Sequence, residues 1–398
     1  MRHRFTKVLL GAALFMLLGG TATVAARSHG SSHATASYNI GFIYPRTGPL
    51  GTYGAEEIQG FKEGLKYLTK GTNKVNGKTL NITYVDDKND AATAVSAAKD
   101  QIGQGTKILM GTGSSGIALQ LAPLAAQNQV LYLSGPAAFD GITGINKYTF
   151  RAGRQTLQDV YAAASYLKGA GRKVVVFDQD SVFGHGNYAA VKAVIGGKGH
   201  TVTEISVPAS ATDFTPFAQQ AKNANADLIF VAWAGTSAGA MWKALDQQNA
   251  FNGTDVVTGL AERATWGALG NDVATKIHFL SHYTYTAPKN KLNDYLVAQL
   301  RKRGQVPDIF TPDGFVLAQM LVHALQKGDY NVDKMIGSLE GWKFLAPKGF
   351  QAIRPQDHAM LQPMFRVKLV LKNNHLVPVV LGTATPYQTA PPIVPMKG

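Results

Sequence analysis

One glycine-rich segment has the spacing of an anion-binding loop. Residues 111–116 (GTGSSG) follow an apolar run and satisfy G-x-G-x-x-G, the pattern of dinucleotide-binding turns. No acidic residue ends the next apolar run, which leads into Ser134, as a ribose contact would require. Backbone N–H groups at a helix start hold a carboxylate as readily as a phosphate, and Ser114 and Ser115 add hydroxyl donors. The segment therefore predicts a small-anion site, with a plain helix cap as the alternative.

A second segment has the spacing of a serine nucleophile. Residues 235–239 (GTSAG) satisfy G-x-S-x-G, the nucleophile elbow of serine hydrolases, and Asp313 followed by His323 or His358 has the right chain order. However, His323 falls inside a predicted helix, and no HGG-type oxyanion loop precedes the serine. A helix start that touches a ligand explains the same residues, so a hydrolase using Ser237 is kept as the alternative.

The elements that must position these segments alternate between short apolar runs and amphipathic stretches. The first series predicts strands at 38–44, 80–85, 107–110 and 130–133, with helices at 56–69, 91–104 and 118–127. The second series predicts strands at 173–177, 202–207, 228–233, 256–258 and 277–283, with helices at 160–169, 188–195, 214–223 and 238–248. Helices at 292–303 and 315–327, strands at 342–345 and 363–371, and a loosely ordered tail from Thr383 complete the prediction.

Two such series predict an α/β protein with two doubly wound parallel-sheet lobes. In open sheets of this kind, ligands bind at the carboxyl ends of the strands. Both glycine-rich segments lie at such ends, so we expect them to border one cleft.

The first 26 residues have the composition of a cleavable signal peptide. Arg2, Arg4 and Lys7 precede an apolar run at 8–18, which is shorter than the roughly 20 residues that span a bilayer. Small residues favour cleavage after Ala26, and residues 27–37 form a polar linker. The sequence contains no cysteine, which excludes a lipid-modified cysteine, cysteine-ligated zinc and thiol catalysis. We therefore expect an exported protein without a lipid anchor.

The basic charge does not indicate nucleic acid. The formal net charge of +14 falls by three once the cations of the signal peptide are removed, and the remaining lysines are scattered. The one tight cluster, at 301–303, ends a predicted helix, where the helix dipole favours cations. No nucleic-acid-binding motif accompanies it.

Several segments together resemble the branched-chain amino acid (Leu/Ile/Val) binding proteins. These are type I periplasmic solute-binding proteins of ABC transporters. The matching segments are YNIGFIYPRTGPLGTYGAEEIQGFKEGLKYL from Tyr38, ITYVDDKND, ILMGTGSSG, LYLSGPAAFD, YTFRAGR, VVVFDQDSVFGHG and IRPQDHAMLQPMF. The resemblance covers residues 38–372.

The resemblance implies two lobes joined by a three-stranded hinge at 150–153, 280–283 and 364–366. Lobe 1 then combines 38–150 with 284–363, lobe 2 combines 151–283 with 364–385, and 386–398 form the tail. The ligand is expected between the lobes.

The resemblance also implies the binding residues. Ser115, with Ser114, corresponds to the family position that holds the ligand carboxylate, and the backbone of Pro136, Ala137 and Ala138 lies beside it. Tyr53 and Phe183 match cleft aromatics, and Trp233 lies in a loop that often carries one.

Two positions decide whether the ligand carries an ammonium group. Glu262 lies at or one residue past the acidic position that pairs with the ammonium, and Ala138 stands where the family often has a hydroxyl residue. If Glu262 points away from the cleft, the ligand need not be an amino acid.

The predicted function is therefore a periplasmic, monomeric, non-enzymatic subunit. It captures a small carboxylate-bearing ligand, an amino acid or small organic acid with a branched-chain or related amino acid favoured, for an inner-membrane ABC permease, without a cofactor or metal. A sensory subunit with the same ligand is a further alternative.

Overall fold

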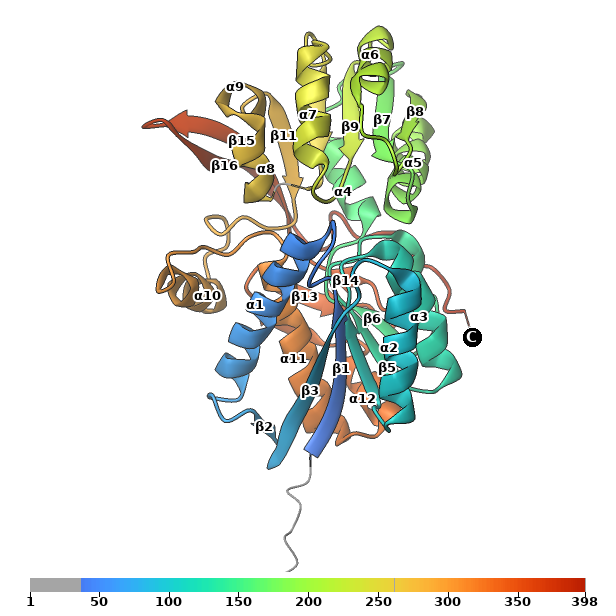
Figure 1. Ribbon diagram of the computed structural model, residues 1–398, viewed down its shortest axis with the longest axis vertical. Coiled ribbons are helices and arrows are strands. Elements are labelled where there is room, and N and C mark those ends of the chain that lie inside the picture. Colours follow the sequence, from blue (N-terminus) through green and yellow to red (C-terminus); the bar gives the residue numbers. More distant parts are fainter. Residues whose placement is uncertain (1–36, 261, 398) are drawn as a thin grey trace, which may run out of the picture. The chain divides into compact units, whose positions relative to one another are not determined.

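The computed structural model describes residues 37–260 and 262–397 (Figure 1). The predicted signal peptide, its cleavage site and the linker as far as residue 36 lie outside these residues. Within the described residues, no helix combines the length and the apolar character needed to cross a membrane.

Lobe 1 is built on a six-stranded sheet in the order β2-β3-β1-β4-β5-β6. Its strands are β1 (Ser37–Tyr44), β2 (Lys74–Val75), β3 (Lys78–Asp86), β4 (Ile108–Gly111), β5 (Leu131–Ser134) and β6 (Thr149–Arg151). All neighbours pair in parallel except β2 with β3, and Ile40 of β1 lies between Ile82 of β3 and Ile108 of β4. The parallel pairing follows from the helical connections between successive strands.

Helices cover both faces of this sheet (Figure 1). One face packs on α1 (Gly51–Leu68), α11 (Thr311–Gly328) and α12 (Val332–Leu339), and the other on α2 (Ala91–Gly103) and α3 (Ser115–Gln127). Lobe 1 also contains α10 (Lys291–Arg301) and a small antiparallel sheet of β12 (Lys343–Ala346), β13 (Gly349–Ile353) and β14 (Met360–Leu361). Residues far apart in the sequence therefore build one lobe.

Glycines bring α1 and α11 into close contact. A Cβ atom on Gly60 would lie 1.7 Å from the Thr311 carbonyl oxygen, and one on Gly314 would lie 1.8 Å from the Glu57 carbonyl oxygen. Only glycine allows two backbones to approach this closely. The contact fixes the first turn of α11 against α1, and thereby places Phe310 beside Tyr53.

Lobe 2 is built on a seven-stranded sheet in the order β16-β15-β11-β10-β9-β7-β8. Its strands are β7 (Lys173–Gln179), β8 (Thr201–Val207), β9 (Leu228–Ala232), β10 (Asp255–Thr258), β11 (Ile277–Ser281), β15 (Met364–Lys372) and β16 (His375–Ala384). Strands β7 to β11 pair in parallel, whereas β15 is antiparallel to β11 and to β16. The late strands thus extend a parallel sheet with an antiparallel edge.

Alternate side chains of β7 face opposite helical layers. Val175 and Phe177 pack toward α6 (Thr215–Asn223), α7 (Ala238–Gln247), α8 (Arg263–Leu269) and α9 (Asn271–Ala274). Val174 and Val176 pack toward α4 (Thr156–Ala163) and α5 (Val182–Val194). This two-sided burial explains the continuous apolar run of the strand. The fold class predicted from the sequence is confirmed.

Several bounds differ from the sequence prediction; for example, the helix expected at 188–195 is α5, which begins at Val182. The helix expected at 160–169 is α4, Thr156–Ala163, which begins at the capping box of Gln155 and Gln158 that the sequence prediction overlooked. In addition, the chain crosses between the two sheets at 152–155, 282–290 and 362–363, and these crossing segments are not themselves strands.

The expected loose tail is wrong for the described residues 385–397. Arg354 donates to the carbonyl oxygens of Pro391 and Pro392, at 2.6 and 3.1 Å, and the Val394 N–H donates to Asp357 at 3.1 Å. The Lys397 N–H donates to the Gly144 carbonyl oxygen at 2.9 Å. The proline-rich composition hid this docking, because side chains and carbonyls of lobe 1 supply the hydrogen bonds that the tail cannot make within itself.

Candidate functional site

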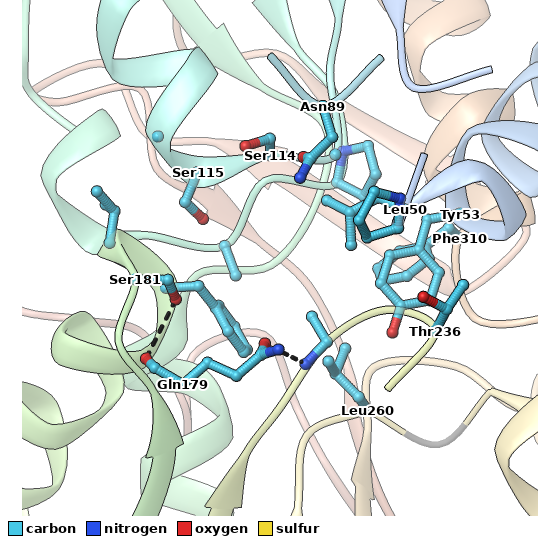
Figure 2. A pocket seen from close by; sticks show the side chains of 18 of the residues that line it. Leu50, Tyr53, Asn89, Ser114, Ser115, Gln179, Ser181, Thr236, Leu260 and Phe310 are labelled. Atoms are coloured by element: carbon cyan, nitrogen blue, oxygen red, sulfur yellow. Dashed lines mark hydrogen bonds between the residues drawn. The ribbon is translucent and has the colours of Figure 1, made fainter. Parts of the chain in front are cut away.

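A cavity of about 450 Å³ lies where segments of both sheets end (Figure 2). Lobe 1 contributes the segment before and into α1, the loop after β4, and the loop after β5. Lobe 2 contributes the segments after β7, β9 and β10. The cavity therefore lies at the carboxyl ends of parallel strands, where α/β sheets bind ligands.

The start of α3 presents hydroxyl groups to this cavity. Ser114 is the N-cap residue of α3, with φ −86° and ψ 120°, and its side chain makes no capping hydrogen bond. The Ser115 Oγ accepts a hydrogen bond from the Phe139 N–H at 3.3 Å, which leaves its own hydrogen for a ligand. These groups can donate to an anionic oxygen while the helix dipole favours negative charge.

Aromatic side chains form the apolar wall of lobe 1. The rings of Tyr53, in the first turn of α1, and Phe310, just before α11, meet edge to face with centroids 4.6 Å apart. The Tyr53 hydroxyl also donates to Glu262 Oε1 at 3.0 Å and accepts from the Gly235 N–H at 3.3 Å. Burial raises the pKa of Tyr53 well above its usual value, so this hydroxyl stays protonated.

Lobe 2 contributes one polar residue at the end of β7 and one aromatic residue in α5. Gln179 Oε1 accepts from the Ala234 N–H at 3.0 Å, which orients the amide toward the loop after β9 (Figure 2). Ser181 caps α5 by accepting from the Gly184 N–H at 3.1 Å, and Phe183 in the first turn lines the cavity.

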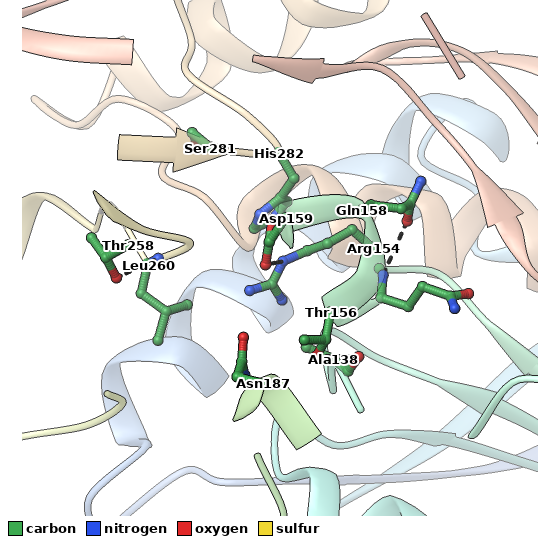
Figure 3. Close-up of polar contacts among 12 residues, drawn as sticks. Ala138, Arg154, Thr156, Gln158, Asp159, Asn187, Thr258, Leu260, Ser281 and His282 are labelled. Atoms are coloured by element: carbon green, nitrogen blue, oxygen red, sulfur yellow. Dashed lines mark hydrogen bonds and ion pairs between the residues drawn. The ribbon is translucent and has the colours of Figure 1, made fainter. Parts of the chain in front are cut away.

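Arg154 brings a charge to the cavity. Its side chain is 1% exposed, and its Nε donates to Asp159 Oδ2 at 3.1 Å (Figure 3). Its Nη2 is buried and has no hydrogen-bond partner among the described residues. Burial raises the pKa of Asp159 to about 7, although Arg154 opposes the shift. Among the described residues that line the cavity, Arg154 has the one charged side chain.

Arg151 fixes the backbone around Arg154. Its Nη2 donates to the carbonyl oxygens of Ala137 and Arg154 at 2.8 and 2.7 Å, and its Nε donates to that of Gly153 at 3.3 Å. The same guanidinium reaches Phe139 O at 3.2 Å. The loop after β5 and the crossing segment at 152–155 are thus held together by one buried side chain.

Six of the nine sequence-predicted residues line the cavity: Tyr53, Ser114, Ser115, Pro136, Ala138 and Phe183. Ala137 does not line it, because it is fully buried and its carbonyl oxygen accepts from Arg151. Trp233 does not line it either. Its ring packs against Phe177 and Phe214 in the core of lobe 2, and Nε1 donates to Ser237 Oγ at 3.0 Å.

Glu262, the ninth residue, lies in a separate cavity of about 200 Å³. Its Oε1 accepts from Tyr53 and, at 2.5 Å, from Thr265 Oγ1, whereas Oε2 is buried without a partner. Burial raises the pKa of this carboxyl group. Tyr53 lines both cavities, so its side chain borders each of them.

The residues of the hydrolase alternative do not meet. Ser237 lines the large cavity, but His323 Nε2 contacts the Ser338 carbonyl oxygen at 3.1 Å, and His358 Nδ1 contacts that of Thr149 at 2.9 Å. Asp313 pairs instead with Lys348 and with His282. The described structure therefore contains no Ser237–His–Asp313 triad.

One group of described residues has the geometry of a metal site. Asp178, His185 and Glu204 offer ligand atoms that all lie within 4.8 Å of one another. Burial raises the pKa of Asp178 to about 7. None of the three lines the large cavity.

Sequence reasoning missed several cavity residues, namely Leu50, Asn89, Arg154, Gln179, Ser181, Leu260 and Phe310. A signal existed for two of them. Gln179 lies two positions past the strand predicted at 173–177, and Arg154 belongs to the YTFRAGR segment that carried the resemblance. Phe310 had none, because only the packing of α11 on α1 brings it to the cavity.

Comparisons with known proteins agree with this architecture. A family model described as periplasmic binding protein matches residues 37–374. A Leu/Ile/Val-binding protein of Rhizobium johnstonii is 25% identical over 315 residues, which cover 77% of this chain and 84% of the relative.

Two solved structures from Rhodopseudomonas palustris are similar over nearly their whole length. An ABC-type branched-chain amino acid transporter is 31% identical with a TM-score of 0.75, covering 91% of this chain and 100% of its own. A solute-binding protein of an ABC transporter in complex with 3,4-dihydroxy benzoic acid is 25% identical with a TM-score of 0.78, covering 88% and 97%. The two lobes, the cavity between strand ends and these matches together establish that the chain belongs to the periplasmic binding protein family.

Proposed function

We propose that this chain is the solute-binding subunit of an ABC importer and captures a small carboxylate-bearing ligand in the 450 Å³ cavity. The observation that carries the proposal is that both lobes line one cavity at their strand ends. A ligand bound there contacts both lobes at once, so binding couples to their relative position.

The cavity chemistry supports a ligand with a polar end and an apolar body. Ser114 and Ser115 supply neutral donors, while Tyr53, Phe183 and Phe310 supply aromatic surface. The similar proteins are named for, or were solved with, ligands of this type. These ligands are leucine, isoleucine, valine and 3,4-dihydroxybenzoic acid, and each carries a carboxylate beside an apolar body.

The remaining sequence predictions fit this role. Family membership implies an extracytoplasmic protein, and we propose that it is exported with cleavage after Ala26, acts as a monomer and delivers its ligand to an inner-membrane permease. The absence of cysteine leaves no site for a lipid-modified cysteine. We propose binding without catalysis, because the candidate triad around Ser237 is not assembled.

Isothermal titration calorimetry on residues 27–398 tests the proposal. We expect binding of at least one small carboxylic acid or amino acid with a dissociation constant near micromolar, about −8 kcal/mol, which still allows release to a permease. Native mass spectrometry of the protein as purified identifies a retained ligand. No binding across a broad acid and amino acid panel, together with ester hydrolysis that Ser237→Ala abolishes, would overturn the proposal.

A further inference from the structure

The charge that the cavity offers to a ligand is positive. Arg154 is the charged side chain among the described residues that line it, and no described carboxylate does so. An ammonium group buried here would find neutral hydrogen-bond acceptors but no opposite charge. Burying an unpaired charge is costly, so the cavity disfavours a zwitterion.

The guanidinium is incompletely satisfied. Its Nε is paired with Asp159, but its Nη2 is buried and finds no hydrogen-bond partner within residues 37–260 and 262–397. Buried donors are nearly always bonded, and an exception at a cavity wall points to a group that arrives with the ligand. A carboxylate is the acceptor that matches a guanidinium best, in charge and in geometry.

The position of this guanidinium is fixed before a ligand arrives. Arg151 donates to the carbonyl oxygens of Gly153 and Arg154. Asp159, in the first turn of α4, accepts from the Arg154 Nε (Figure 3). A charged donor held in place loses little conformational entropy on binding. The neighbouring Ala138 offers no side-chain hydroxyl to an ammonium group.

The one acidic candidate for an ammonium partner is engaged elsewhere. Glu262 lines the smaller cavity, and its Oε1 already accepts from Tyr53 and Thr265. Glu262 is not among the residues that line the large cavity, and the Tyr53 hydroxyl, which belongs to a residue lining both cavities, donates to it.

We propose that the Arg154 guanidinium binds the carboxylate of the ligand, and that the ligand is a carboxylic acid with an apolar or aromatic body and no ammonium group. This inference rests on the proposed solute-binding function and names its ligand class.

Wild-type calorimetry with matched ligands separates the inference from the function on which it rests. The probes are 3-phenylpropionate, 3-phenylpropanamide and phenylalanine, with 4-methylpentanoate, its amide and leucine as a second set. We expect the acid of at least one set to bind. Its amide lacks the charged partner of Arg154, and its amino acid buries an unpaired ammonium group, so each should bind at least about thirtyfold more weakly.

A variant then assigns the effect to Arg154. Arg154→Gln should weaken acid binding by about thirtyfold or more and leave amide binding within about threefold, which removes the preference for the acid. Arg154→Lys should retain part of the preference, because the charge remains without the planar fork. Arg172→Gln is the control: it removes a guanidinium that is 47% exposed and does not line the cavity, and the acid-to-amide ratio should stay as in wild type.

Each outcome decides. An amino acid that binds more tightly than its desamino acid overturns the ligand class and leaves the solute-binding function standing. An unchanged acid affinity in a folded Arg154→Gln variant overturns the role of Arg154. If that variant does not fold, the wild-type ratios between acid, amide and amino acid decide alone. If no acid or amino acid binds at all, the proposed function fails with the inference.

Discussion

The two cavities that share Tyr53 differ in the charge they present. The larger one, of about 450 Å³, is lined by the Arg154 guanidinium, and the smaller one, of about 200 Å³, by the Glu262 carboxyl group. Both groups are buried, but their partners differ. Arg154 pairs with the Asp159 carboxyl group, whereas Glu262 has the neutral hydroxyls of Tyr53 and Thr265.

One buried side chain can determine which charge on a ligand a cavity accepts. Tyr53 borders both cavities, with Arg154 lining one and Glu262 the other, so a compact ligand in the large cavity meets the cation and not the anion. A buried group that lacks an opposite charge is stabilised by becoming neutral, as the raised pKa of Glu262 indicates. An arginine side chain does not become neutral in this way, so its buried positive charge still needs an anion beside it.

The largest effect is expected at Tyr53, which lines both cavities. Tyr53→Ala removes the ring that packs on Phe310 and the hydroxyl bonded to Glu262. We expect the affinity for the acid to fall by about thirtyfold or more, and the preference for an acid over its amino acid to become smaller. The free energy of unfolding should also fall, by about 3–5 kcal/mol. Calorimetry measures the two affinities, and urea denaturation measures the free energy of unfolding. Tyr53→Phe keeps the ring and should retain the preference, and an unchanged preference in Tyr53→Ala would contradict the separation of charges.

The pH dependence of stability tests how fully Asp159 neutralises Arg154. The pKa of this carboxyl group is about 7 in the folded chain, above its ordinary value of 3.8, so the folded state binds the proton more tightly than the unfolded state. Its contribution to stability is therefore greatest below about pH 4 and is lost as the pH rises toward 7, by at most about 1.4 kcal/mol per pH unit.

The measurement is the free energy of unfolding of wild type and Asp159→Asn from pH 4 to 8. The difference between the two chains cancels the other carboxyl groups, including Asp178, whose pKa is also about 7. A wild-type chain that gains stability relative to Asp159→Asn as the pH rises would show instead that the pair keeps Asp159 ionised.

The neutral donors of the large cavity should matter less than its charge. Ser115→Ala removes one hydroxyl that accepts from the Phe139 N–H and faces the cavity, so we expect a loss of about 1 kcal/mol, or about fivefold in acid affinity. Calorimetry measures the loss, and Ser165→Ala, an exposed serine outside the cavity, is the matched control. A loss larger than that of Arg154→Gln would make α3, and not Arg154, the main anion site.

The smallest effect is expected at the small cavity. Glu262→Gln keeps the shape of the side chain and an oxygen acceptor for Tyr53, and it removes a carboxyl group whose Oε2 is buried without a partner. Acid affinity should stay within about threefold of wild type, and the thermal midpoint should not fall, since an uncharged amide is cheaper to bury. Loss of ligand binding in this variant would place Glu262 in contact with the ligand.

The fold was predictable because its signals are local. Apolar runs such as the one at β7 (KVVVFDQ) and the turns that follow them specify strand and helix within a few residues. The docking of the tail was not predictable, because its partners Arg354 and Asp357 lie more than thirty positions away in the sequence.

The candidate site divides in the same way. Glycine and serine residues at a strand end mark the start of α3 in the sequence. Ser114 and Ser115 were predicted from them as ligand-binding residues, and both line the cavity. Trp233 was expected at the ligand because its loop resembles a cleft segment of the family, yet its indole N–H donates to Ser237 and its ring packs on Phe177 and Phe214 in the core.

The sequence by itself determined the order of strands and helices, the two lobes and the loops that end at one edge of each sheet. Only the tertiary structure decided which charge faces the ligand cavity. Arg154 and Arg151 lie three positions apart, and both side chains are buried. The guanidinium of Arg151 donates to carbonyl oxygens of the loop after β5. The guanidinium of Arg154 borders the cavity instead, and its Nη2 has no partner among the described residues.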